Sequence, residues 1–131
     1  MRKPRIAVPT LLTLLFASCS LTQHVDAAKA AVKHFHEQLD SGQFAVIYAE
    51  TDPQFKSATS EQQFTDLLAA IHRKLGKVTS AEVAGWKVNT NTNGAFVALT
   101  YTTHFGAEQA TEKFDWRLVG YRIESAALVT K

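Results

Sequence analysis

The stretch that decides the fold is Ala95–Phe105, AFVALTYTTHF. Apolar side chains recur at every second position and leave small or polar side chains between them. The apolar positions are Val97, Leu99, Tyr101 and Phe105. A period of two is typical of a strand that buries one face and leaves the other in solvent. The sequence therefore predicts a long strand that needs a covering layer on one side.

The same alternation flanks this stretch on both sides. The apolar positions are Ala84, Trp86 and Val88 before it, and Phe114, Trp116 and Leu118 after it. Asn93-Gly94 joins the first two segments and is a strong signal for a tight hairpin. Gly120 predicts a further turn into a last strand over Tyr121–Val129. We therefore expect a curved antiparallel sheet of about four strands.

Upstream of the strands the period becomes helical. A helix is predicted over Val25–Leu39, because apolar residues recur there every three or four positions. A short helix over Phe44–Ala49 follows, after which Asp52 and Pro53 suit the cap and first residue of another turn. A third helix over Ser60–Leu75 opens with a capping box. These helices must cover the apolar face of the sheet, so residues 25–131 are predicted to form one α+β domain.

The first eighteen residues have the order of a secretory signal. Arg2, Lys3 and Arg5 form a basic start, residues 6–17 are mostly apolar, and the only cysteine of the chain, Cys19, comes next. The apolar run has about twelve residues, whereas a helix that spans a membrane needs roughly twenty. We therefore expect a signal peptide over residues 1–18.

The sequence Leu15-Phe16-Ala17-Ser18-Cys19 resembles the lipobox of bacterial lipoprotein precursors, although Phe16 replaces the usual aliphatic residue. The resemblance implies cleavage before Cys19, acylation of its thiol, and a short tether over residues 19–24. Two or more acyl chains hold a protein stably at a membrane. Ser20 resembles the pattern sorted to the outer membrane of Gram-negative bacteria, with the domain facing the periplasm. An ordinary signal peptide is the alternative.

The charge balance argues against a nucleic-acid-binding surface. The chain has fourteen Lys and Arg residues and twelve Asp and Glu residues. Three of the basic residues lie in the leader, so the remainder is nearly neutral. With one cysteine, no disulfide can form within the chain. His34 and His36 do not share a helix face, and no spacing of ligands suits a metal, so we predict no metal or cofactor.

The order of elements resembles the nuclear-transport-factor-2-like superfamily, whose cone-shaped, cystatin-like domains pack helices into a bent sheet. The likeness rests on Leu39–Phe44 (LDSGQF), Tyr48, Phe55, the helix over Phe64–Gly76, and Trp116–Ile123 (WRLVGYRI). It is nearest to small exported bacterial domains of unknown function. The resemblance implies a cone interior but no settled activity.

A cone interior of this kind can hold a ligand or an active site. Phe35, Tyr48, Tyr101 and Trp116 are the candidate pocket-lining residues. Asp52, with Tyr48, Tyr101 and His36, is a candidate base, but its position before Pro53 is better explained as a helix cap. Because no acid–base pair emerges from the spacing, we predict no catalytic residue.

The sequence thus favours a membrane-anchored, non-enzymatic lipoprotein that acts through a protein partner or by self-association. Its membrane contact is the lipid on Cys19. Two alternatives stay open: a small apolar or amphipathic ligand bound inside the cone, and an enzyme that uses the same interior.

Overall fold

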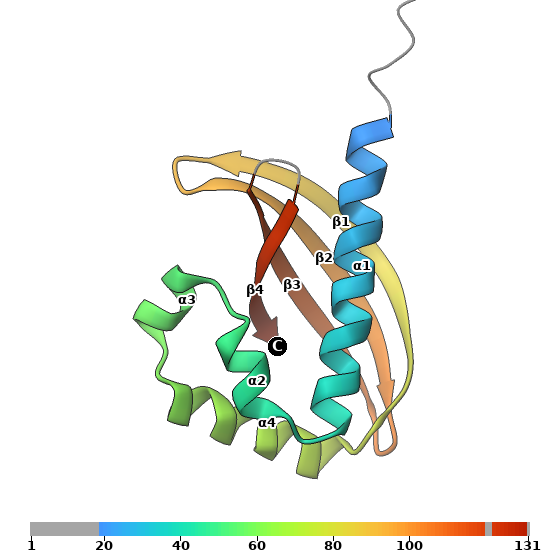
Figure 1. Cartoon of the computed structure of the whole chain (residues 1–131). Helices are drawn as coiled ribbons and strands as arrows, with labels where there is room; N and C mark the ends of the chain where they lie inside the picture. Colours follow the sequence, from blue (N-terminus) through green and yellow to red (C-terminus); the bar gives the residue numbers. More distant parts are fainter. Residues whose placement is uncertain (1–18, 120–121, 131) are drawn as a thin grey trace, which may run out of the picture.

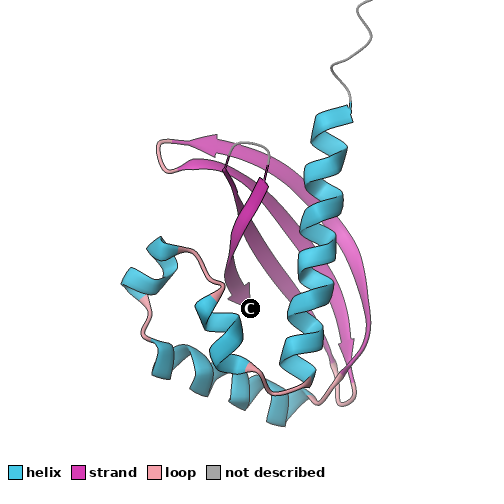
Figure 2. Cartoon of the chain, viewed as in Figure 1, coloured by secondary structure: helices cyan, strands magenta, loops and turns pink. Residues whose placement is uncertain are grey.

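The computed structural model describes the backbone of residues 19–119 and 122–130 and the side chains of residues 22–118 (Figure 1). All helices precede all strands in the chain (Figure 2). The helices are α1 (Cys19–Asp40), α2 (Phe44–Ala49), α3 (Pro53–Ala58) and α4 (Glu61–Leu75), and the strands are β1 (Val78–Asn91), β2 (Gly94–Phe105), β3 (Gln109–Val119) and β4 (Arg122–Thr130). The predicted α+β class is confirmed. The predicted signal peptide and the turn at Gly120 lie outside the described residues.

The helices differ from the prediction at two places. The turn at Pro53 forms a separate helix, α3, so the described chain has four helices where we predicted three. The described part of α1 already includes residues 19–24, upstream of the predicted start near Val25, so the predicted tether is helical. Val25 and Ala28 are already buried, with 3% and 0% of their surface exposed. The folded part therefore begins within two turns of Cys19.

Both predicted helix caps are present. The Asp52 carboxylate accepts a hydrogen bond from the Gln54 amide at 2.8 Å, at the start of α3. Ser60 and Gln63 form a reciprocal capping box at the start of α4. Each such cap contributes about 1 kcal/mol.

The sheet is antiparallel with the strand order β1-β2-β3-β4, so the strands follow one another as neighbours. The predicted hairpin joins β1 and β2, where Gly94 has φ 128°, a conformation that favours glycine. β1 and β4 form the two edges of the described sheet. The sheet curves around α1, and the N-terminal end of α1 projects past the ends of the strands (Figure 1).

β1 contains a bulge at Ala84. The extra residue lies between Val83 and Gly85, which pair with consecutive residues of β2. The residues opposite Val83 and Trp86 in β2 are Tyr101 and Leu99, and both are buried. Val83 and Trp86 therefore lie on the same inner face. The bulge makes this possible although the two residues are three positions apart. Our prediction placed Ala84 on that face with Trp86 and Val88, but Ala84 is the extra residue of the bulge and pairs with no residue of β2.

The core lies between the inner face of the sheet and the helices. Phe35 of α1 packs edge-on against Phe114 of β3, with ring centroids 5.4 Å apart. Phe55 of α3 packs in the same manner on Phe64 of α4, at 5.0 Å. The largest fully buried apolar side chains are Phe64, Phe114, Leu39, Leu68, Leu99, Val32 and Val97. These contacts set the positions of the candidate sites.

Candidate functional site

The structure brings three of the four candidate pocket residues together. Phe35, Tyr101 and Trp116 surround Phe114, with ring centroids 5.4, 5.9 and 6.4 Å from it. Tyr48 lies elsewhere: its ring is beside Phe64, and its hydroxyl donates to the Thr59 carbonyl at 2.9 Å. The aromatic set therefore divides into two groups.

The space around the first group is nearly filled. Phe35, Tyr101 and Trp116 are 5%, 6% and 7% exposed. The hollow that Phe35 and Trp116 border holds only about 70 Å³, whereas ligand pockets measure roughly 300–1,000 Å³. That volume is too small for a ligand. The indole Nε1 of Trp116 is buried and has no hydrogen-bond partner within the described structure.

A buried polar cluster lies beside this aromatic group. His36 Nε2 is 2.7 Å from Glu112 Oε2, and Thr103 Oγ1 donates to the same oxygen at 2.5 Å. The three residues come from α1, β3 and β2, and they are 6%, 3% and 0% exposed. Of these three residues, the sequence analysis had identified only His36 as a candidate. Glu112 is 76 positions away from it, and no local pattern marks such a pairing.

Glu112 also acts on Tyr101, its direct neighbour across β2 and β3. Burial raises the pKa of the Tyr101 hydroxyl above its ordinary value, and the negative charge of Glu112 raises it further. Tyr101 is therefore a neutral phenol at physiological pH. It is a poor candidate for a general base.

The cluster is better suited to holding α1 on the sheet than to catalysis. The His36 ring packs against Phe35, Tyr101 and Phe114, with centroids 5.6, 6.4 and 6.0 Å away. Its side chain is only 8% exposed, so little of the imidazole is open to a substrate. A buried pair of this kind is costly to break because one partner would be left charged in a low dielectric.

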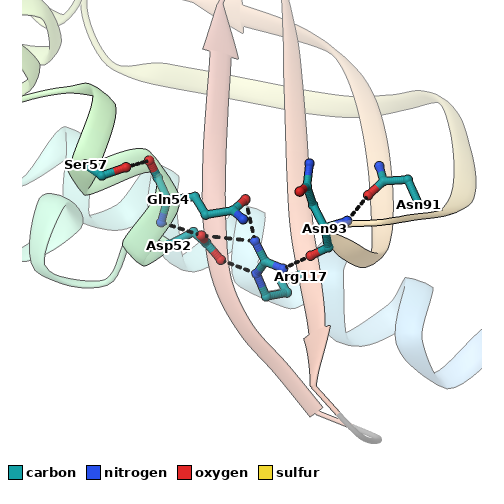
Figure 3. Close-up of polar contacts among 6 residues, drawn as sticks. All are labelled: Asp52, Gln54, Ser57, Asn91, Asn93 and Arg117. Carbon is teal, nitrogen blue, oxygen red and sulfur yellow. Dashed lines mark hydrogen bonds and ion pairs between the residues drawn. The ribbon is translucent and has the colours of Figure 1, made fainter.

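Asp52, the candidate base, is held by Arg117 (Figure 3). Arg117 Nε donates to Asp52 Oδ2 at 2.5 Å and Nη2 to Oδ1 at 3.3 Å. Arg117 also donates to Gln54 Oε1 at 2.8 Å and to the Asn93 carbonyl, and it lies over the Phe96 ring at 4.8 Å. These contacts connect α3, the β1–β2 turn and β3. Asp52 is thus a structural residue.

A groove of about 510 Å³ lies between α4 and the β2–β3 turn. Its apolar wall consists of Leu67, Ala70, Ile71, Leu75, Phe105 and Ala110. Lys74 and Glu108 form an ion pair at its rim, 3.9 Å apart. The Ala107 amide donates to the Leu75 carbonyl at 2.9 Å and fixes one end. The sequence did not reveal this groove.

Glu112 connects the buried cluster with the groove. The residue lines the groove, while its Oε2 takes both hydrogen bonds from inside the domain. No hydrogen bond to Oε1 occurs among the described residues. Because the Glu112 side chain is only 4% exposed, the groove offers mainly its apolar wall and the charged pair at its rim.

The described chain lacks both a metal-binding cluster and a membrane-spanning helix. Residues 19–119 and 122–130 contain no group of three His, Cys, Asp or Glu residues that could hold a metal ion. Among these same residues, no helix has the length and apolarity needed to cross a membrane.

No curated protein matches this sequence. A family model described as "Protein of unknown function (DUF4019)" matches residues 31–121, from the second half of α1 to just past β3. This range includes His36, Thr103, Glu112 and Arg117, and it leaves out Cys19. Because the match covers more than half of the chain, the protein belongs to the DUF4019 family.

Proposed function

We propose that this protein is a bacterial lipoprotein of the outer membrane, anchored through Cys19 and facing the periplasm. We further propose that its domain belongs to the nuclear-transport-factor-2-like superfamily and works by binding another protein rather than by catalysis. The observation that carries the proposal is the short stretch of chain between Cys19 and the core: residues 19–24 are helical, and Val25 is already buried, with 3% of its surface exposed. An acylated Cys19 would be the first residue of a helix that is packed into the core from Val25 onward. The lipid would thus hold the domain close to the membrane surface.

The surface of β1 supports a role in protein binding. Val83 and Trp86 are 38% and 53% exposed on the inner face of this edge strand. Tryptophan is enriched among the residues that dominate binding energy at protein interfaces. Edge strands also offer free backbone groups to a partner strand. The nearly filled interior around Phe114 favours this surface over the cone as the place of action.

Labelling with radioactive palmitate tests the anchor. The full-length chain in a Gram-negative host is expected to take up label and to fractionate with the outer membrane. Cys19→Ser should abolish the label. Ser20→Asp is the matched control: it should keep the label but change the membrane fraction. Label that survives in Cys19→Ser would show that Cys19 is not the acylated residue.

Crosslinking in intact cells tests the protein-binding role. Trp86→Ala is expected to weaken the protein adducts of the full chain, while Val46→Ala, which alters a side chain 45% exposed on α2, should leave them unchanged. Equal amounts of adduct in the wild type, in Trp86→Ala and in Val46→Ala would mean that the interaction surface does not include Trp86.

The α4 groove favours a second candidate function, the binding of an amphipathic small molecule. Its volume of about 510 Å³ falls within the range of ligand pockets. The apolar wall suits an alkyl chain, and Glu108, a lining residue whose side chain is 54% exposed, suits a hydrogen-bond donor or cationic head. A long-chain primary amine has both features.

A further inference from the structure

β1 leaves one side of its backbone without a partner strand. It forms an edge of the described sheet, and its only neighbour there is β2. The strand runs over Val78–Asn91 and contains no proline. A long edge strand presents a row of N–H and C=O groups that another strand can pair with. A protein that leaves such an edge open requires either a protective device or a partner.

The side chains of β1 give this edge a distinct pattern. Val83 and Trp86 are exposed on the inner face. Glu82 and Lys87 are exposed on the outer face, because they lie opposite Thr102 and Ala98 of β2. Within the described part of the chain, neither of the two charged residues makes an ion pair. Each charge therefore remains available to an incoming strand.

The bulge at Ala84 restricts how two copies of β1 can pair. Over Ser80–Val83 and over Gly85–Asn91 the inner and outer residues alternate regularly, and the extra residue between these two arms shifts the alternation by one. A second irregularity lies between Val78 and Ser80. When two antiparallel copies align their bulges at Ala84, inner residues lie opposite inner residues from Ser80 to Asn89. The twofold axis then passes between Ala84 and Gly85 of each copy.

We propose that β1 pairs in this register with β1 of a second copy of the chain. Val83 then faces Trp86 of the second copy, and Glu82 faces Lys87, each pair occurring twice because of the symmetry. Aromatic and β-branched side chains stabilise a sheet when they lie directly opposite, and so do opposite charges. The sheets of the two copies join into one. The bulge, the apolar pair and the charged pair all select the same alignment.

The proposed pairing depends on the protein-binding role proposed above. It identifies the partner as a second copy of this protein. It does not depend on the lipid. Failure of the self-pairing and failure of the anchor are therefore separable, because palmitate labelling reports the anchor in every variant used below.

Charge reversal tests the register. The full-length chain, measured by light scattering after size exclusion, is expected to be a dimer. Glu82→Lys and Lys87→Glu each place like charges opposite one another twice, and each should raise the dimer dissociation constant roughly tenfold. The double variant exchanges the two charges and should restore the wild-type constant. A monomeric wild-type chain, or a double variant as weak as the single ones, would overturn the proposal.

Cysteine crosslinking provides a second, independent test. Opposed residues in an antiparallel pair have Cα atoms about 4.5–5.5 Å apart, a distance that a disulfide spans. A chain carrying both Val83→Cys and Trp86→Cys is expected to form a covalent dimer on mild oxidation. Either substitution alone should not, because each new cysteine then lies three residues away from its symmetry mate. These single variants also control for Cys19. Adducts with other proteins but no covalent homodimer would assign β1 to a different partner and reject the self-pairing.

Discussion

His36 Nε2 and Glu112 Oε2 lie 2.7 Å apart in the interior of the domain and join α1 to β3. Thr103 completes the contact from β2 by donating to the same carboxylate oxygen. The cluster thus holds the long N-terminal helix on the inner face of the sheet. Its position next to the α4 groove makes Glu112 part of both the core and a surface feature.

Removal of the imidazole should destabilise the fold strongly. His36→Ala leaves the Glu112 carboxylate buried without its main partner, and we expect the free energy of unfolding to fall by about 3–5 kcal/mol. Urea unfolding of the full-length chain measures the change. His34→Ala is the matched control, because its side chain is 59% exposed on the same helix, and it should cost less than about 0.5 kcal/mol. Equal effects for the two variants would contradict a stabilising role for the buried pair.

The raised pKa of Tyr101 predicts a loss of stability in alkaline solution. The unfolded chain ionises this phenol near its ordinary pKa of 10.0, whereas the folded chain keeps it protonated to higher pH. Its contribution to stability is therefore fully present below pH 10 and is lost as the pH rises through the folded-state pKa.

Unfolding curves measured as a function of pH, with tyrosinate absorbance recorded in parallel, check this expectation. Tyr101→Phe should flatten the alkaline part of the stability profile. Tyr48→Phe, which removes a phenol distant from Glu112, should leave that part unchanged. An alkaline profile that Tyr101→Phe does not alter would show that another group causes the loss.

The contact between Asp52 and Arg117 should depend on the shape of the guanidinium. Arg117→Ala removes the guanidinium that binds Asp52, which is 4% exposed, and we expect a loss of about 3–5 kcal/mol in the free energy of unfolding. Arg117→Lys retains the charge but cannot bridge both carboxylate oxygens, so it should recover only part of the loss. A double-mutant cycle with Asp52→Asn, which keeps a capping oxygen for Gln54, isolates the ion pair. A coupling energy near zero would contradict this interpretation.

The α4 groove should bind a long-chain primary amine such as dodecylamine. Ala70 lines the groove, so Ala70→Trp is expected to fill it and weaken binding by roughly tenfold in isothermal titration calorimetry. Gln62→Trp places the same indole on α4 outside the groove and should bind like the wild type. Equal affinities for Ala70→Trp and Gln62→Trp would mean that the amine binds at another place.

Several features of this protein could be predicted from local sequence because their causes are local. Ser60 and Gln63 lie within one turn and cap each other, and Asp52 caps α3 from two residues away. Asn93-Gly94 predicts its hairpin because Gly94 adopts a positive φ. The alternation over Ala95–Phe105 identified the buried face of β2, since each side chain of a strand points away from the next. These signals were sufficient for the α+β class.

The contacts that give the protein its candidate sites depend on residues far apart in sequence. His36 and Glu112 meet only because α1 packs on the inner face of the sheet, and Asp52 meets Arg117 only because α3 packs near the β1–β2 turn. The bulge at Ala84 leaves no signal in the apolar pattern, yet it turns Val83 and Trp86 to the same face. The sequence by itself determined the elements, their caps and the buried face of the sheet. Only the tertiary structure decided which polar residues pair and where apolar surface stays exposed, because packing of distant elements selects among partners that local chemistry cannot distinguish.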